Sequence, residues 1–268
     1  SAGCPEKNMN DTLLGVETLS KRFGGVEAVA GVSFHVRRGE IYSLIGPNGA
    51  GKTTTFNMIS GVVKPSSGTV HFDGRDITGM PAHRLAAIGI GRTFQNLAVF
   101  KHASVVDNLM VGRHCHMATN VLDASWFFGR ARREEIDHRR KVEEIIDFLE
   151  IEEIRDMPVG TLSYGLQKRV ELGRALATEP KLLLLDEMVS GMNSEETEDI
   201  ARFVLDIRDE LGISVLMVEH DMGIVMDISD RVCVLNFGRK IGEGTPAEIS
   251  ANPAVIDAYL GSKTKEAA

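Results

Sequence analysis

The segment from Gly46 to Thr53, Gly-Pro-Asn-Gly-Ala-Gly-Lys-Thr, constrains the fold of this chain more than any other. It fits the pattern G-x-x-x-x-G-K-[ST], in which successive backbone N–H groups surround phosphate oxygens. Such a loop stands between a strand and a helix. The apolar run Ile41–Ile45 predicts a buried strand, and Thr53–Ser60 predicts a helix whose dipole points at the phosphates. A glycine-rich turn that matched by accident would lack this context, so the segment predicts a bound nucleoside triphosphate.

Individual residues of this phosphate-binding loop have distinct expected roles. Lys52 is predicted to reach the β- and γ-phosphates, and the Thr53 hydroxyl is predicted to ligate Mg²⁺. The glycines allow positive φ angles and a close approach of backbone to anion. The predicted nucleotide contacts in this segment are Gly46, Pro47, Asn48, Gly49, Ala50, Gly51, Lys52, Thr53 and Thr54.

Composition narrows the class of protein. The balance of 30 basic and 38 acidic residues disfavours a general nucleic-acid binder, which shows a basic footprint. Cys4, Cys115 and Cys233 lie far apart and are odd in number, as expected for free thiols in a reducing compartment. Unbroken apolar runs such as Leu182–Leu185 are far shorter than the roughly 20 residues that span a membrane. These features predict a soluble, cytoplasmic chain that acts at a membrane only through other chains.

Short apolar strands alternate with helices along much of the chain, which predicts a mostly parallel sheet covered on both faces. The N-terminal region differs, because two strands joined by Gly24-Gly25 indicate an antiparallel β region. Between Asn96 and about Gly160 the pattern becomes helical, and we interpret this block as an insertion. The predicted strands are Leu13–Leu19, Val26–Val36, Ile41–Ile45, Thr69–Phe72, Ile88–Thr93, Leu182–Leu185, Ile213–Val218 and Arg231–Asn236. The predicted helices are Thr53–Ser60, a short one opened by Pro81, Ser104–Gly112, Glu134–Leu149, Ser163–Ala177, Ser194–Leu211 and Met222–Asp227.

Two carboxylates end the predicted buried strand Leu182–Leu185. In a nucleotide hydrolase, a carboxylate in the position of Asp186 sits beside Mg²⁺, and one in the position of Glu187 can orient and deprotonate an attacking water. Acidic residues also end strands at protein surfaces without any chemistry. The phosphate-binding loop upstream favours the catalytic interpretation.

The segment Leu162-Ser163-Tyr164-Gly165-Leu166-Gln167-Lys168-Arg169 decides the family. It resembles the signature of ATP-binding cassette (ABC) ATPases, usually Leu-Ser-Gly-Gly-Gln followed by a basic residue. Ser163 is predicted to cap the helix to about Ala177, so that its hydroxyl, the Gly165 N–H and the helix dipole face an anion. By composition alone this is an ordinary helix cap. The resemblance implies that the anion is the γ-phosphate of a nucleotide held by the other subunit of a dimer.

Further segments match the family in order. The resemblance implies that Gln95 joins the Mg²⁺ and water shell to the membrane partner, and that His220 senses the γ-phosphate. Ser190–Asn193 resembles the loop that crosses the dimer interface. By position Phe23 suits either a core aromatic or a platform for a base, and the resemblance implies adenine stacking there, with Val29 packing nearby. It therefore implies catalytic roles for Glu187, His220, Gln95 and Lys52, and Mg²⁺ ligation by Thr53, Gln95 and Asp186.

The resemblance extends from Leu13 to about Leu260 and implies a P-loop NTPase α/β fold in one ABC ATPase domain, residues 1–268. The core is expected at about 12–95 and 178–260, the helical signature subdomain at about 96–177, and a mobile tail at 261–268. Four positions depart from the family pattern. Tyr164 replaces a glycine, Leu166 a polar residue, Met188 a proline and Asn193 an aspartate.

Within the family, the chain resembles the ATPase subunits of branched-chain amino-acid importers, on Arg92–Asn96, Tyr164, the insert after Val111 and the ending Asn252–Gly261. This implies an ATPase that uses ATP and Mg²⁺ at the cytoplasmic face of the cell membrane. Its partners would be a second ATPase subunit (a copy or a paralogue), transmembrane permease subunits and, indirectly, a periplasmic or extracellular solute-binding protein. No nucleic-acid partner is expected.

Two alternatives stay open. The ATPase of an exporter, such as the lipopolysaccharide-extracting type, shares length and motifs. A soluble ABC protein of DNA repair, translation or iron–sulfur assembly is disfavoured, because Thr53–Leu162 lacks sustained heptads and the chain has one cassette.

Three further features have ordinary explanations. The run His114–His116 offers poor geometry for a metal. Arg130–Lys141, with expected pairs Glu135/Arg139 and Asp137/Lys141, indicates a solvated helix face. Trp126-Phe127-Phe128 suits packing inside the insert better than contact with lipid or with the membrane subunit.

Overall fold

The computed structural model describes residues 11–93, 99–116 and 128–266, and the chain divides into two compact units. Unit 1 comprises residues 1–82 and 205–268, and unit 2 comprises residues 83–204. The predicted helical segment 96–177 falls within unit 2, which also contains two strands. The limits given above for a core, a helical subdomain and a mobile tail stay predictions.

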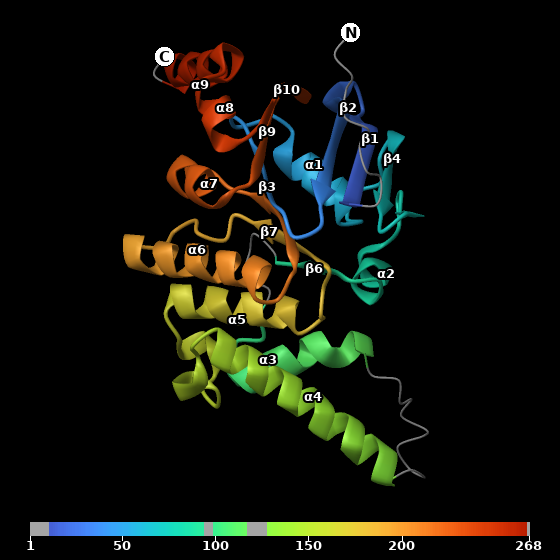
Figure 1. Cartoon of the computed structure of the whole chain (residues 1–268), viewed down its shortest axis with the longest axis vertical. Coiled ribbons are helices and arrows are strands. Elements are labelled where there is room, and N and C mark those ends of the chain that lie inside the picture. The colour runs from blue at the N-terminus through green and yellow to red at the C-terminus, as the bar shows by residue number, and fades with distance from the viewer. Residues whose placement is uncertain (1–10, 94–98, 117–127, 267–268) are drawn as a thin grey trace. The chain divides into compact units, whose positions relative to one another are not determined.

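Unit 1 contains the predicted antiparallel region and a mostly parallel sheet (Figure 1). The antiparallel sheet has the order β2-β1-β4-β5, and the other sheet has the order β10-β9-β3-β8 within this unit. β3 runs parallel to both β8 and β9, and every residue of β3 and β8 is buried, as expected for strands covered on both faces. The strands are β1 (Thr12–Phe23), β2 (Val26–Arg37), β3 (Ile41–Ile45), β4 (Ser67–Phe72), β5 (Arg75–Asp76), β8 (Ser214–Val218), β9 (Arg231–Asn236) and β10 (Arg239–Gly244).

β10 was not predicted, although a local signal for it exists. Asn236 pairs with Arg239, so Phe237 and Gly238 alone form the turn between β9 and β10. Both turn residues have positive φ, 45° and 75°, as a two-residue hairpin turn requires. Glycine meets that requirement easily and phenylalanine does not. The sequence therefore shows only half of the usual Asn-Gly signature.

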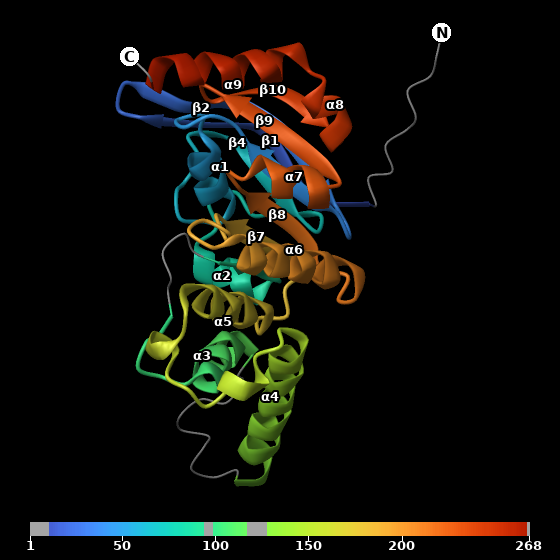
Figure 2. The ribbon, with the colours of Figure 1, turned by 90° about the vertical axis from the view of Figure 1, so that its left-hand side faces the viewer.

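The helices of unit 1 are α1 (Lys52–Ile59), α7 (Met222–Ile228), α8 (Pro246–Ser250) and α9 (Pro253–Glu266). α1 contacts β2 and β8 (Figure 1). α8 starts with a capping box, in which Thr245 accepts from the Glu248 amide and Glu248 accepts from the Thr245 amide, with Pro246 in the first turn. α9 contacts β10 and α8, and Figure 2 shows it running beside β10. Neither α8 nor α9 was predicted.

Unit 2 combines the parallel pair β6 (Ile90–Arg92) and β7 (Leu182–Asp186) with a group of helices. α3 packs against both α4 and α5, and Gly173 of α5 permits this, because a Cβ there would lie 3.0 Å from a Leu149 methyl group and 3.2 Å from one of Leu109. Ser104, the first residue of the predicted helix Ser104–Gly112, caps α3. The helices are α2 (Ala82–Ala87), α3 (Val105–Gly112), the 3₁₀ turns η2 (Arg113–His116), η4 (Glu152–Ile154) and η5 (Val159–Thr161), and α4 (Phe128–Phe148), α5 (Tyr164–Leu176) and α6 (Ser194–Asp209), whose last residues belong to unit 1.

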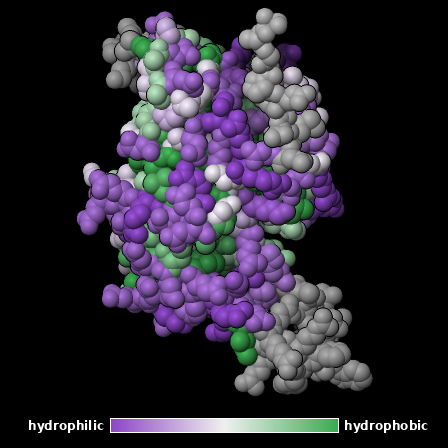
Figure 3. Space-filling model, in the orientation of Figure 1, coloured by the Kyte–Doolittle hydropathy of each residue, from purple (hydrophilic) through white to green (hydrophobic). Residues whose placement is uncertain are grey.

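On the face in Figure 3 hydrophilic residues predominate, and hydrophobic residues appear in patches among them. α4 carries the expected pair Glu135–Arg139 at 3.3 Å. The expected pair of Asp137 with Lys141 is wrong, because Asp137 lies 3.7 Å from Arg140 instead. Among the described residues, no helix is long and apolar enough to span a membrane.

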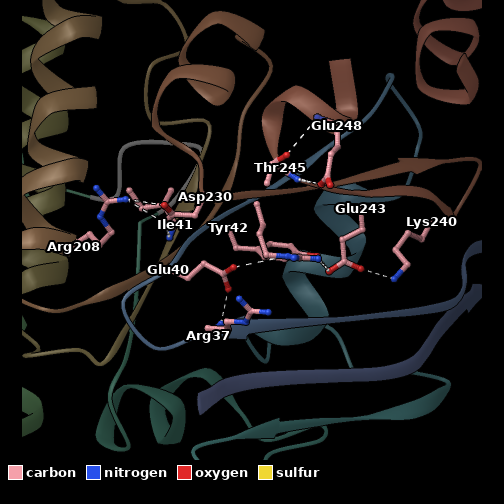
Figure 4. A network of polar contacts seen from close by, with 11 residues as sticks. Arg37, Glu40, Ile41, Tyr42, Arg208, Asp230, Lys240, Glu243, Thr245 and Glu248 are labelled. Carbon is pink, nitrogen blue, oxygen red and sulfur yellow. Dashed lines mark hydrogen bonds and ion pairs between the residues drawn. The ribbon is translucent and has the colours of Figure 1, made fainter. Parts of the chain in front are cut away.

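A polar network in unit 1 centres on Glu243 of β10 (Figure 4). Its Oε1 accepts from the buried Tyr42 hydroxyl at 3.1 Å and from Arg231 at 3.3 Å, and its Oε2 accepts from Lys240 at 2.7 Å. Burial raises the pKa of the Glu243 carboxyl, but Lys240, Tyr42 and Arg231 outweigh burial, so the pKa ends below its usual range. The network joins β3, β9 and β10.

A second part of the network holds the start of β3. Glu40 accepts from the Arg37 amide at 2.6 Å, and Asp230 accepts from the Ile41 amide at 2.8 Å and from Arg208 at 3.0 Å (Figure 4). β3 leads directly into the phosphate-binding loop, so these contacts fix the position from which the loop departs.

Replacing Glu243 with glutamine should lower the free energy of unfolding by about 1–2 kcal/mol, since the partners lose a charged acceptor. A carboxyl whose pKa is lowered by folding stabilises the protein above its unfolded pKa, near 4.5, and loses that contribution as the pH falls through the folded value. Urea unfolding at several pH values should therefore show a gap between wild type and variant that is constant near neutral pH and shrinks below about pH 4.5. Glu27→Gln, at an exposed position of β2, is the control. A gap independent of pH down to pH 3 would contradict the assignment.

Candidate nucleotide-binding site

The phosphate-binding loop leaves β3 after Ile45 and enters α1 at Lys52. Gly46, Gly49 and Gly51 have φ angles of 147°, 77° and 99°, a region that disfavours residues with a Cβ. Two of them also lack room for a side chain. A Cβ on Gly46 would lie 2.1 Å from the Leu235 carbonyl oxygen, and one on Gly51 would lie 2.7 Å from the Ala28 carbonyl oxygen. The loop is therefore pressed against the end of β9 and against β2.

Lys52 lies over the loop that precedes it. Its ammonium group donates to the carbonyl oxygens of Gly46 at 2.7 Å and Pro47 at 3.2 Å, and the side chain is buried. The next residues differ in access. Thr53 is exposed in the first turn of α1, whereas Thr55 is fully buried and donates to the Gly51 carbonyl at 2.9 Å. Thr53 is therefore the more exposed of these two residues.

Phe23 and Val29 occupy very different environments. Phe23, the last residue of β1, is 50% exposed, and the Lys21 ammonium lies 5.1 Å from the centre of its ring. The alternative of a core aromatic at Phe23 is therefore wrong. Val29 is fully buried in β2, and its methyl group would lie 3.3 Å from a Cβ on Gly51, so it supports the loop from behind.

His220 stands at the edge of the sheet from which the phosphate-binding loop departs. β3 and β8 are parallel, with Leu44 beside Val218, so both chains leave the sheet at their carboxyl ends on the same edge. His220 is exposed there. Asp221 caps α7 by accepting from two amides, at 2.9 and 3.3 Å, which fixes the backbone after the histidine.

In unit 2, Asp186 is the last residue of β7 and Glu187 follows it, so the two carboxylates end the strand as predicted. Asp186 is 2% exposed, and its Oδ2 lies 3.2 Å from the Arg92 guanidinium. Its Oδ1 is buried without a hydrogen-bond partner in the part of the chain that the structure describes. Burial raises the pKa of the Asp186 carboxyl, and the charge of Glu187 raises it further. Arg92 and the buried Lys168 lower the pKa but do not cancel the rise.

Glu187 is half-buried and has a left-handed backbone, with φ of 50°. This conformation is uncommon outside glycine, asparagine and aspartate, and functional sites are enriched in such residues. Met188, where the family usually has proline, is 1% exposed and packs into the core.

The signature segment forms the predicted helix N-terminus. Ser163 caps α5, and its hydroxyl oxygen accepts from the Leu166 amide at 3.3 Å. A Cβ on Gly165 would lie 2.4 Å from the Glu196 carboxylate, so a larger residue there would displace the Glu196 side chain. The replacement of glycine by Tyr164 is accommodated at the surface, where the ring is 42% exposed.

Asn193 acts locally as a helix cap. Its side-chain oxygen accepts from the Glu196 amide at 2.9 Å, and the Glu196 carboxylate accepts from the Asn193 amide at 3.3 Å. A neutral amide fills this capping role as well as aspartate does. The loop from Ser190 to Asn193 and the signature also meet, because a Cβ on Gly191 would lie 3.7 Å from the Tyr164 ring.

Some sequence predictions concern residues outside those described. Gln95, Trp126 and Phe127 belong to the ranges 94–98 and 117–127, which are not described. Cys4 belongs to the range 1–10, which is not described either. Within the described residues, no cluster of three or more His, Cys, Asp or Glu side chains has a geometry suited to a metal. His116 contacts the Thr178 carbonyl at 2.8 Å.

Two contacts of the site were not predicted. In the sequence Arg92 is only a mark of the subfamily, and its ion pair with Asp186 depends on the pairing of β6 with β7. Tyr259 of α9 forms a hydrogen bond with the backbone of Gly46, and burial raises the pKa of its hydroxyl to about 12. Neither contact has a local sequence signal, since each joins distant parts of the chain.

Comparison with known proteins agrees with this geometry. Residues 29–190 match the ABC transporter family, and residues 239–263 match a segment described as branched-chain amino acid ATP-binding cassette transporter. The chain is 42% identical to the high-affinity branched-chain amino acid transport ATP-binding protein BraF of Pseudomonas aeruginosa, over 94% of this chain and 99% of that protein. It is 35% identical to the lipopolysaccharide export system ATP-binding protein LptB of Haemophilus influenzae, over 95% and 99% of the two chains.

Among solved structures, the ADP conformation of MJ1267, an ATP-binding cassette of an ABC transporter, superposes with a TM-score of 0.82 and 35% identity, covering 93% of this chain and 99% of the other. A nucleotide-free ATP-binding cassette from an ABC transporter gives a TM-score of 0.80 at 34% identity, covering 92% and 98%. The glycine-rich loop that Lys52 covers, the strand that ends in Asp186 and the serine-capped helix α5 are thus parts of one known architecture, and this chain belongs to the family of ABC transporter ATP-binding proteins.

Proposed function

We propose that this chain is the ATP-hydrolysing subunit of an importer for branched-chain amino acids or a closely related small solute. The match of residues 239–263 to the branched-chain amino acid transporter segment carries the solute assignment. The higher identity to BraF than to LptB, 42% against 35%, supports an importer over the lipopolysaccharide exporter. The ATPase does not itself contact the solute, so solute specificity would reside in partner chains.

In the proposed mechanism, residues of unit 1 bind the nucleotide. The exposed ring of Phe23 stacks on the adenine, and the amides of Gly46–Thr53 surround the phosphates. Lys52 exchanges its bonds to the loop carbonyls for bonds to the β- and γ-phosphates, which offsets their charge. His220, at the same edge of the sheet, contacts the γ-phosphate.

The described residues suit Mg²⁺, a hard cation that prefers oxygen ligands. Thr53 is an exposed residue with a hydroxyl group, and Asp186 offers a buried carboxylate oxygen without a hydrogen-bond partner among the described residues. These two residues, together with Gln95, would hold the ion, which when bound neutralises charge on the phosphate oxygens. Glu187 orients and deprotonates the attacking water. The left-handed backbone of Glu187 sets the direction in which its side chain leaves the main chain.

The second half of the site is proposed to come from another ATPase subunit. The N-terminus of α5, with the Ser163 hydroxyl and the Gly165 amide, offers donors and a positive dipole end to a γ-phosphate. Two ATP molecules would then lie between the phosphate-binding loops and the α5 helices of two subunits, which are copies of this chain or this chain and a paralogue. Closure on ATP and opening after hydrolysis would move permease subunits at the cytoplasmic face of the membrane.

Reconstitution tests the solute assignment. The chain would be purified with the membrane subunits that co-purify with it, and inserted into liposomes with the corresponding solute-binding protein. We expect ATP-dependent uptake of labelled leucine, isoleucine or valine, with urea and an aromatic acid as competing solutes. Uptake of none of the branched-chain amino acids, or co-purification with lipopolysaccharide-export subunits, would overturn the assignment.

A further inference from the structure

Residues at the end of β6 contact both the main chain and the side chain of Asp186. β6 and β7 are parallel, with Arg92 beside Leu184, so residues 92 and 93 lie next to the end of β7. The Thr93 hydroxyl accepts from the Asp186 amide at 3.3 Å, and the Thr93 amide donates to the Leu184 carbonyl at 3.0 Å. The Arg92 guanidinium completes the arrangement with its 3.2 Å contact to Asp186 Oδ2.

This ion pair is largely shielded from water. The side chain of Arg92 is 14% exposed and that of Asp186 is 2% exposed. A buried carboxylate without a nearby cation is strongly unfavourable, and removing one partner of a buried pair leaves that charge uncompensated. Lys168 is the second cation that acts on Asp186, but it is itself paired with Glu171 at 3.4 Å, both being fully buried. Arg92 is therefore the main compensating charge for Asp186 in this structure.

We propose that Arg92 is a positioning residue that acts as the resident counterion of Asp186 and competes with Mg²⁺ for that carboxylate. The inference rests on the proposed role of Asp186 toward Mg²⁺. Arg92 occupies Oδ2 and leaves Oδ1 as the buried oxygen without a partner in the described part of the chain. When the ion binds, two positive charges act on one carboxylate, so each weakens the other. Arg92 would thus keep Asp186 charged and in place before nucleotide arrives, and would weaken the hold on Mg²⁺ once it has.

The competition between Arg92 and Mg²⁺ for Asp186 can be measured, because the coupling between two groups that bind the same carboxylate is reciprocal. If Mg²⁺ weakens the contribution of Arg92 to stability, then loss of Arg92 must strengthen Mg²⁺ binding by the same factor. A residue that only packs between β6 and β7 would show no such coupling. A residue that helps Mg²⁺ bind would show a coupling of the opposite sign.

The experiment compares wild type and Arg92→Gln by thermal melting in ADP with a chelator and in ADP with Mg²⁺. With the chelator, the variant should melt roughly 5–10 °C below wild type, as expected for breaking a buried pair. With Mg²⁺ this gap should shrink to less than half. Titration of Mg²⁺ at fixed fluorescent ADP should show half-saturation about 3–10-fold lower in the variant, from the loss of one positive charge beside the site.

Two further variants keep the test decisive if Arg92→Gln folds poorly. Arg92→Lys, which retains the charge, should restore part of the melting temperature and most of the wild-type Mg²⁺ dependence. Arg139→Gln removes an exposed arginine of the same unit, whose partner is Glu135, and should shift melting equally with and without Mg²⁺.

The outcomes separate the two proposals. If Mg²⁺ does not alter ADP binding or melting of the wild type, the proposed function of Asp186 fails. If the wild type responds but the gap between wild type and Arg92→Gln is the same or larger with Mg²⁺, the competition between Arg92 and Mg²⁺ is refuted. The same holds if the variant requires more Mg²⁺ than wild type.

Discussion

Glu187→Gln should reduce ATP turnover by about 10²–10⁴-fold, the range contributed by a general base, while ATP still binds. The amide is nearly isosteric with the carboxylate but cannot accept a proton from the attacking water. Because Glu187 is only half-buried and glutamine keeps the shape of the side chain, the fold should persist. Phosphate release measures the turnover, and binding of a fluorescent ATP analogue measures the affinity.

The control for this result is Glu153→Gln, which removes an exposed carboxylate of the same unit. It should leave both turnover and affinity unchanged. Turnover of Glu187→Gln within a factor of three of wild type would rule out Glu187 as the general base. Another group would then have to deprotonate the attacking water.

Gly46→Ala should disrupt the phosphate-binding loop more than any other single methyl group added to it. The new Cβ would lie 2.1 Å from the Leu235 carbonyl oxygen and 3.1 Å from the Ala50 Cβ, so the backbone of β3 or β9 must move. The φ of 147° adds strain of about 1–3 kcal/mol. The amides that surround the phosphates would shift with the backbone. We expect ATP affinity to fall at least tenfold, together with a clear loss of melting temperature.

A matched control for Gly46→Ala is Gly31→Ala in β2. Gly31 also has a positive φ, 67°, but a Cβ there meets nothing within 4 Å. This variant should lose about 1 kcal/mol of folding stability through backbone strain alone, and its ATP affinity should be unchanged. If the two variants lose ATP affinity equally, the close approach to Leu235 does not shape the loop.

The parts of the site that follow from local sequence could be predicted. The loop from Gly46 to Thr53, the strand into Asp186 and the cap at Ser163 each depend on residues within about ten positions, and all three form as expected. Phe23 shows the limit of this approach. Its position suits either a buried or an exposed ring, and only the family resemblance, through adenine stacking, indicates the exposed ring that the structure shows.

What could not be predicted depends on contacts between segments far apart in the chain. Arg92 reaches Asp186 because β6 pairs with β7, 94 residues later in sequence. The bond between Tyr259 and Gly46 requires α9 to pack beside β10, and neither of these two elements was predicted. The strand β10 itself depends on Phe237 adopting a positive φ, which propensity disfavours.

The proposal as a whole requires that ATP held at Lys52 of one subunit closes against the Ser163 end of α5 in another. Sedimentation of Glu187→Gln, alone and mixed with any ATPase subunit that co-purifies with it, tests this directly in Mg·ATP and in Mg·ADP. We predict a dimer with ATP and a monomer with ADP, and we predict that adding Ser163→Arg abolishes the dimer while ATP remains bound. A protein that binds ATP but stays monomeric under all these conditions, or a dimer indifferent to Ser163→Arg, would contradict the account.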